Sequence, residues 1–106
     1  MTAGRAGRVR VMLYLRARET DEPGIEDAYH RISEDLAATP GLLGNELLRN
    51  LTEPGGWAVL SEWESLDAFR RWESGSAHRG TTSPLRPYQD RERSLPFALL
   101  EVAARH

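Results

Sequence analysis

The hydrophobic positions change period along this chain, and the changes divide it into strands and helices. From Val9 to Arg18 the residues alternate, with aliphatic side chains on one side and mostly arginine, Met12 and Tyr14 on the other, which predicts a strand. From about Gly24 to Ala38 the apolar residues recur at helical spacing, which predicts a helix. The residues on its apolar face are Ile25, Ala28, Tyr29, Ile32 and Leu36.

The segment from Trp57 to Trp72 contains the sharpest change of period. Its first part alternates, so Trp57, Val59, Ser61 and Trp63 share one face of a predicted strand, Trp57 to Glu64. From Leu66 the residues Leu66, Phe69 and Trp72 recur every three positions and predict one apolar ridge of a helix that ends near Gly75. Ser65 is placed to cap this helix. If both indole rings face inward, Trp63 and Trp72 wall one cavity.

The remaining segments complete the pattern. Leu42 to Leu51 predicts a strand, and the EPGG sequence after it predicts a hairpin turn. Ser83 begins a short helical turn, and Leu95 to Ala103 predicts a last strand whose apolar character suggests that both faces are covered. The order β-α-β-β-α-β predicts an α+β, ferredoxin-like fold, in which two helices cover one face of a four-stranded antiparallel sheet. We expect residues 1–7 to be a disordered lead and residues 8–104 to form a single domain.

The sheet face without helices is not polar, whichever of the two alternating sets of strand residues points to it. It exposes some of Val11, Leu13 and Leu15, or else Ala58 and Leu60, together with residues of the last strand. An apolar sheet face on a small protein indicates an interface, and symmetric pairing of two copies would bury it. The sequence therefore predicts a homodimer.

Composition excludes several classes of function. The 106 residues include no cysteine and no lysine, so disulfides, thiol nucleophiles, lysine Schiff bases and P-loops are excluded. The net charge is −2 and the arginines are interspersed with acidic residues, which argues against a nucleic-acid surface. No apolar run approaches the roughly 20 residues of a membrane span, and the first residues do not have the pattern of a secretory signal. We expect a cytoplasmic protein.

The run EWESLDAFRRWESGSAHR, inside this order of strands and helices, resembles the antibiotic biosynthesis monooxygenase family of dimeric α+β barrel proteins. The resemblance extends from Val9 to Val102. It implies a homodimer. Members of the family include cofactor-independent oxygenases of aromatic polyketide intermediates, haem-degrading enzymes and quinol monooxygenases. Trp63 matches the tryptophan that lines the pocket of the polyketide oxygenases. The chain departs from those enzymes at Val59, where they have asparagine, and at Phe69, where they have tyrosine.

The candidate site residues follow from the pattern and the resemblance together. We expect Trp63, Trp72, Val59, Phe69 and Ser61 to bind substrate. From the residues alone Trp63 could equally be plain core, and the ridge with Leu66 and Phe69 favours a core role for Trp72. The candidates for the catalytic base or donor are His78, in the loop after the second helix, Tyr14, on the first strand, and Arg86, which matches a family arginine. A surface position explains Tyr14 equally well.

No cofactor is expected. The three histidines have no metal-ligand spacing, and GRAGRV precedes the first strand instead of following it as a dinucleotide fingerprint does. The haem-degrading enzymes carry their iron-ligating histidine where this chain has residues around Thr82, so haem degradation is not expected.

Three hypotheses about function follow. The first is a cofactor-independent monooxygenase that uses O₂ on an aromatic polyketide-type intermediate in antibiotic biosynthesis. The second is a polyketide cyclase or isomerase that uses the same pocket for acid–base chemistry. The third is a non-catalytic ligand-binding protein, which a pocket too small or too closed for a ring system would favour.

Overall fold

A single antiparallel sheet forms the centre of the computed structural model, which describes residues 7–75, 83–95 and 97–106. The strands lie in the order β2-β3-β1-β4, so the first and third strands of the chain are central. Their bounds are Val9–Arg16 (β1), Leu42–Arg49 (β2), Gly56–Trp63 (β3) and Phe97–Glu101 (β4). Together with the helices between them, this order confirms the predicted ferredoxin-like fold.

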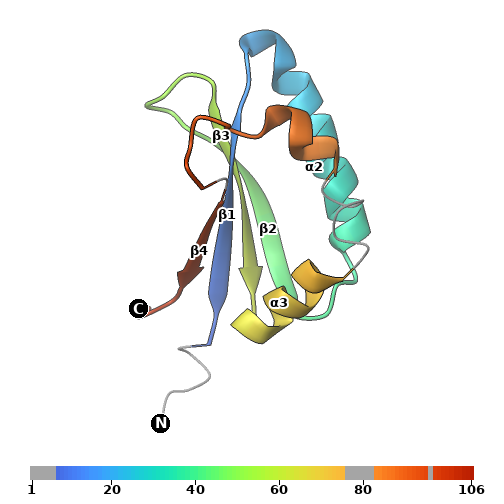
Figure 1. Ribbon diagram of the computed structural model, residues 1–106, viewed down its shortest axis with the longest axis vertical. Helices are drawn as coiled ribbons and strands as arrows, with labels where there is room; N and C mark the ends of the chain where they lie inside the picture. The colour runs from blue at the N-terminus through green and yellow to red at the C-terminus, as the bar shows by residue number, and fades with distance from the viewer. Residues whose placement is uncertain (1–6, 76–82, 96) are drawn as a thin grey trace.

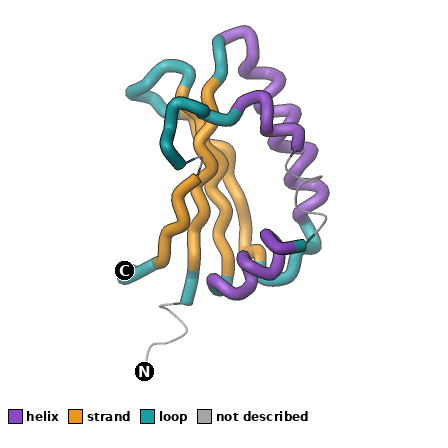
Figure 2. The backbone as a smooth tube through the Cα atoms, in the orientation of Figure 1, coloured by secondary structure: helices purple, strands orange, loops and turns teal. Residues whose placement is uncertain are grey.

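The helices pack on one face of the sheet (Figures 1 and 2). The short turn η1 (Glu19–Asp21) leads into α2 (Glu22–Leu36), whose buried residues Ile25, Ala28, Ile32 and Leu36 are those of the predicted apolar face except for Tyr29. The helix α3 (Leu66–Ser74) follows β3, and the turn η2 (Ser83–Tyr88) begins at the predicted Ser83. No helix among the described residues is both long and apolar enough to cross a membrane.

The strands β1, β2 and β4 each end two residues earlier than predicted, and the reason is clear for β2. After β1, the Ala17 N–H donates to the Gly55 carbonyl, 2.9 Å away, which extends the β1–β3 pairing by one residue before the chain leaves the sheet. After β2, the Asn50 side chain accepts from the N–H groups of Thr52 and Glu53 at 2.9 and 3.1 Å. Asparagine competes with the ladder in this way because its short side chain reaches the backbone two or three residues ahead. The predicted lead, residues 1–7, lies outside the described residues except for Gly7.

The helix α3 begins as predicted but packs differently. Ser65 Oγ accepts from the Ala68 N–H at 3.1 Å and caps the helix. Leu66 is 43% exposed, so the predicted ridge does not include it, whereas Ala68 and Phe69 are each 3% exposed. The small Ala68 packs closely against Gly41, and Ala68 instead of Leu66 is buried in the first turn.

The core consists of two clusters at opposite ends of the sheet. The α2 cluster comprises Leu15, Ala17, Ile25, Ala28, Ile32, Trp57, Val59 and Leu85. The α3 cluster comprises Val9, Val11, Trp63, Ala68 and Phe69. The helix α3 has only nine residues, so it covers one end of the sheet and leaves the middle to the side chains between the clusters.

The second sheet face carries no helix among the described residues. The register fixes its parity: Tyr14 pairs with Ala58 and Met12 with Leu60, and these four side chains are half-buried on that face. Leu100, on β4, is 50% exposed. The prediction that both faces of the last strand are covered therefore does not hold within one chain.

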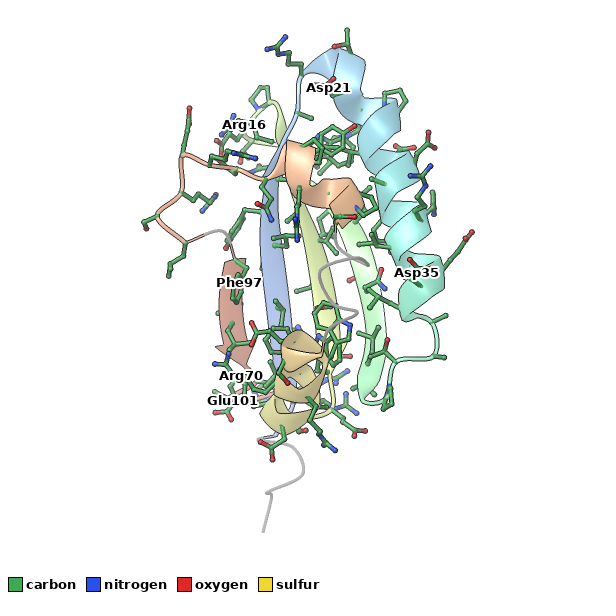
Figure 3. All side chains as sticks on the ribbon, turned by 45° about the vertical axis from the view of Figure 1, so that its right-hand side comes forward. Arg16, Asp21, Asp35, Arg70, Phe97 and Glu101 are labelled. Atoms are coloured by element: carbon green, nitrogen blue, oxygen red, sulfur yellow. The ribbon has the colours of Figure 1, made fainter. Side chains whose placement is uncertain are left out.

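A charged cluster fastens the segment after η2 to the end of β1. The Asp90 carboxylate is 6% exposed and lies 3.8 Å from Arg16 Nε and 3.4 Å from Arg93 Nε. The Asp90 N–H donates to the Tyr14 carbonyl at 3.1 Å. A hydrogen bond to Glu53, and then the charge of Asp90, raise the pKa of Arg16 above its ordinary value. Figure 3 shows Arg16 at this end of β1. The cluster holds η2 over the helix face of the sheet.

Candidate functional site

A cavity of about 220 Å³ lies between the two core clusters and is partly open to solvent. The sheet forms its floor, and α2, α3 and η2 contribute its walls. The residues that line it are Val11, Leu13, Ile32, Leu36, Asn45, Val59, Ser61, Trp63, Phe69, Trp72, Glu73, Leu85, Gln89 and Phe97. Phe97, which begins β4, is labelled in Figure 3. The lining is mostly apolar with a few polar side chains, which is the usual character of a small-molecule site.

Three aromatic rings form one wall. The ring centroids of Trp63 and Trp72 are 5.4 Å apart, and the planes are tilted by 35°. The Phe69 ring meets Trp63 edge-on at 5.5 Å. Trp63 is 1% exposed, whereas Trp72 is half-buried, so Trp63 is fixed in the core and Trp72 lies nearer the solvent. The predicted pair of indole rings beside one cavity is therefore present.

The indole N–H of Trp63 is satisfied by its neighbour on the same strand face. Trp63 Nε1 donates to Ser61 Oγ at 2.9 Å. A buried indole needs such a partner, and residues two apart on a strand point to the same side. The bond fixes both the ring and the serine side chain.

Asn45 is a cavity residue that sequence reasoning missed. It lies on β2 opposite Ser61 in the register, and Ser33 Oγ of α2 donates to its Oδ1 at 3.1 Å. From the sequence Asn45 counted only as a weak strand residue. An irregularity in the β2–β3 register between Leu42 and Gly44 breaks the alternation of β2, so a parity count that starts at Leu42 puts Asn45 on the wrong face, whereas a count from Leu47 puts it on the helix face.

Two further polar side chains, Glu73 and Gln89, were also missed. Glu73 is the one ionisable side chain among the described residues that line the cavity. Its Oε1 accepts from Arg70 Nη1 at 2.8 Å, and no hydrogen bond to its Oε2 is formed within the described part of the chain. The sequence could have indicated Glu73 as a cavity residue, because it directly follows the predicted cavity residue Trp72. Gln89 could not be found in this way, because the fold of the segment after η2 brings it to the cavity.

The five predicted substrate-binding residues, Trp63, Trp72, Val59, Phe69 and Ser61, all line the cavity. Of the three predicted polar candidates, the two that the structure describes, Tyr14 and Arg86, do not join them. Tyr14 lies on the opposite sheet face, where the Arg93 guanidinium is 3.8 Å from its ring centroid. Arg86 is exposed on η2 and is not part of the lining, and His78 lies outside the described residues.

This geometry can bind a flat apolar ring and hydrogen-bond an oxygen on it. A cavity of about 150 Å³ is enough to hold benzene, so the larger cavity accepts an aromatic ring with substituents. Asn45, Ser61 and Gln89 are neutral groups able to donate hydrogen bonds. Among the described residues, no group of three or more histidine, aspartate or glutamate side chains could hold a metal ion.

A sequence model of the antibiotic biosynthesis monooxygenase family matches residues 8–82. Protein SchA of Streptomyces halstedii is 35% identical over 104 residues, which cover 98% of this chain and 27% of that protein. The 42.8 kDa protein in the whiE locus of Streptomyces coelicolor is 36% identical over 93 residues, which cover 88% of this chain and 23% of that protein. The chain thus spans about a quarter of the length of these relatives.

Solved structures of similar fold cover nearly the whole chain. SnoaB, a cofactor-independent oxygenase from Streptomyces nogalater, superposes with a TM-score of 0.69 at 20% identity, covering 95% of this chain and 96% of SnoaB. The haem-degrading protein of Mycobacterium tuberculosis superposes with a TM-score of 0.70 at 21% identity, covering 93% of this chain and 98% of that protein. At these identities the likeness establishes the fold alone.

Proposed function

This chain belongs to the antibiotic biosynthesis monooxygenase family, and from that premise we propose that it is a cofactor-independent monooxygenase of an aromatic polyketide-type intermediate. The observation that carries the proposal is the cavity walled by Trp63, Trp72 and Phe69. Streptomyces relatives of the chain support the substrate class, since they include a protein named polyketide synthase CurD, 27% identical over 93 residues, which are 25% of its length.

The proposed chemistry lies mainly in the substrate. Loss of a proton from an anthrone-type CH₂ group gives a carbanion stabilised as a phenolate-like anion. This anion passes one electron to O₂, and the two radicals combine to form a C–O bond. After the peroxide takes up a proton, the remaining C–H proton leaves as the O–O bond breaks, which gives a carbonyl group and one water molecule. The protein needs a base, a site that excludes water and donors for the anion.

The side chains of the cavity match these needs. Glu73 is the carboxylate in the described lining and is our candidate base. His78, the candidate from the sequence, lies outside the described residues. The indole of Trp63 and that of Trp72 offer faces on which a planar ring stacks. Since the cavity accepts about one substituted ring, the remaining rings of a polycycle extend through its open side.

Oxygen uptake with anthrones tests this function directly. In the absence of added flavin or metal we expect one O₂ consumed for each anthrone, and a product that has gained one oxygen atom, derived from ¹⁸O₂, and lost two hydrogens. Val59→Phe fills the cavity and should abolish uptake, whereas Leu51→Phe, at a position 90% exposed, should leave it unchanged. No uptake by the wild-type protein with any of several anthrones would rule the proposal out.

A cyclase or isomerase is the second candidate, and one observation favours it. Val59 and Phe69 present only apolar surface to the cavity, so its polar groups are the neutral donors Asn45, Ser61 and Gln89 and the carboxylate Glu73. A carboxylate base with neutral donors suits an enolate intermediate. Such an enzyme needs no O₂. Product mass separates the two, because cyclisation with dehydration loses water, whereas oxygenation adds oxygen.

We also propose that two copies pair through the helix-free sheet face. That face carries Met12, Leu60, Leu48 and Leu100 beside the Arg10–Glu62 ion pair, and apolar side chains gathered on an uncovered sheet face are an interface signal. We expect light scattering at micromolar concentration to report a dimer. Leu60→Glu should give a monomer, because it buries a charge at the interface, whereas Leu51→Glu, in the hairpin loop, should remain dimeric. A monomeric wild-type protein would contradict this expectation.

A further inference from the structure

Two hydrogen-bonding side chains face each other on the cavity floor. Asn45 of β2 and Ser61 of β3 are direct partners in the antiparallel register, and both line the cavity. Directly opposed residues on one face of such a pair have Cβ atoms about 4.5–5.5 Å apart. The two side chains can therefore reach the same atom of a molecule in the cavity.

The orientation of the Asn45 amide is set from outside the cavity. Ser33 Oγ donates to Asn45 Oδ1, so the carbonyl side of the amide is engaged by α2. The Tyr29 hydroxyl donates to the Asn45 backbone carbonyl at 3.1 Å, which ties the same residue to α2 a second time. The Asn45 Nδ2 group makes no hydrogen bond to any described residue, so its two hydrogens are available to a ligand.

The orientation of the Ser61 side chain is likewise fixed by a neighbour, the indole of Trp63. Ser61 Oγ accepts the Trp63 indole N–H, and Trp63 is too deeply buried to turn away. With that acceptor position occupied, the hydroxyl hydrogen of Ser61 is directed elsewhere, and no acceptor for it occurs among the described residues. Asn45 and Ser61 thus both present donors to the cavity without moving.

We infer that Asn45 and Ser61 form a donor pair that binds the substrate oxygen on which negative charge develops, an inference that rests on the function proposed above. Ser33 is a positioning residue, since it acts only through the Asn45 amide. Donors fixed before the reaction stabilise a developing anion without reorganisation, which is why such pairs are effective in a dry site.

The charges around this pair are few. Glu73 of α3 is the one ionisable side chain in the described lining, and the Arg70 guanidinium is paired with it. From α2 the lining residues are Ile32 and Leu36, and from the segment around η2 they are Leu85 and Gln89, none of which ionises. A bound anion is therefore repelled by one carboxylate in the described lining, that of Glu73, whose charge is partly neutralised by Arg70.

Two small probes test the pair: 4-nitrophenol, whose anion is visible by absorbance, and 4-nitroanisole, which has no ionisable oxygen. We expect the wild-type protein to bind the phenolate about tenfold or more tightly than the ether, because a hydrogen bond to a charged oxygen is the stronger kind. The bound phenol should ionise at a lower pH than the free phenol. Calorimetry gives the affinities, and visible absorbance gives the ionisation.

Matched variants separate the donor role from general damage. Asn45→Leu and Ser61→Ala should each remove most of the preference for the phenolate while keeping the affinity for the ether. Ser33→Ala should lose part of it, and Glu34→Ala, an exposed neighbour on α2, should lose none. Glu73→Gln should strengthen phenolate binding. Asn45→Asp keeps an acceptor for Ser33 but offers no donor, so it should favour the ether even if Asn45→Leu does not fold.

The outcomes distinguish this inference from the proposed function. Equal affinity of the wild-type protein for both probes, or an unchanged preference in Asn45→Leu and Asn45→Asp, overturns the donor pair and leaves the aromatic cavity standing. Failure of the wild-type protein to bind either probe overturns both.

Discussion

Replacement of Trp63 by alanine should lower the free energy of unfolding by about 3–5 kcal/mol, the usual cost of removing a large aromatic side chain from a core. Trp63 is 1% exposed, touches the rings of Phe69 and Trp72, and donates to Ser61. Domains of this size are stable by only about 5–15 kcal/mol, so the loss is a large fraction of the total. Urea denaturation followed by circular dichroism measures it.

Trp63→Phe serves as the control for this variant. It keeps an aromatic ring against Phe69 and Trp72 but removes the N–H that fixes Ser61, so we expect a smaller loss of stability, about 1–2 kcal/mol. Because Ser61 is then free to rotate, the preference for 4-nitrophenolate should fall although the ring still stacks. A loss below about 1 kcal/mol in Trp63→Ala would contradict the core role of this residue.

Gly41→Ala should destabilise the protein by about 2–4 kcal/mol, for two additive reasons. Gly41 has φ +85°, a conformation that costs an L-residue about 1–2 kcal/mol. An added Cβ would also fall well inside van der Waals contact of Ala68 Cβ, where α3 packs against the start of β2. The Gly41 carbonyl accepts the Glu64 N–H at 2.8 Å, so neither segment can move away freely.

Gly44→Ala is the matched control, because it makes the same chemical change three residues later. Gly44 lies in β2 with no positive φ, and no atom lies within 4 Å of an added Cβ. We expect a change within about 0.5 kcal/mol, as for an ordinary surface substitution. Thermal or urea unfolding of the two variants side by side measures the difference. Equal effects at Gly41 and Gly44 would contradict both the cost of the positive φ and the cost of the contact with α3.

The amino-acid sequence by itself determined the order of the elements. Periods of 2 and 3.6 are local properties of the backbone, and they mark β1, α2, β3 and α3 from the residues alone. The sequence also grouped Val59, Ser61 and Trp63 on one strand face and led from Trp63 into the helix of Phe69 and Trp72 through a single capping residue. These residues lie within 14 positions of one another, so local geometry was enough to bring them to one cavity.

Tertiary structure decided the polar half of the site. Which face of β1 receives the helices depends on packing across the whole sheet, and this packing puts Tyr14 on the face away from the cavity. The bulge near Gly44 reverses the parity of β2 and turns Asn45 inward, where Ser33, 12 residues earlier in the chain, orients it. The cavity itself exists because α2 and the short α3 cover opposite ends of one sheet and leave a gap between the two core clusters. The sequence of a single segment cannot predict such a gap, because the gap depends on how several segments pack together.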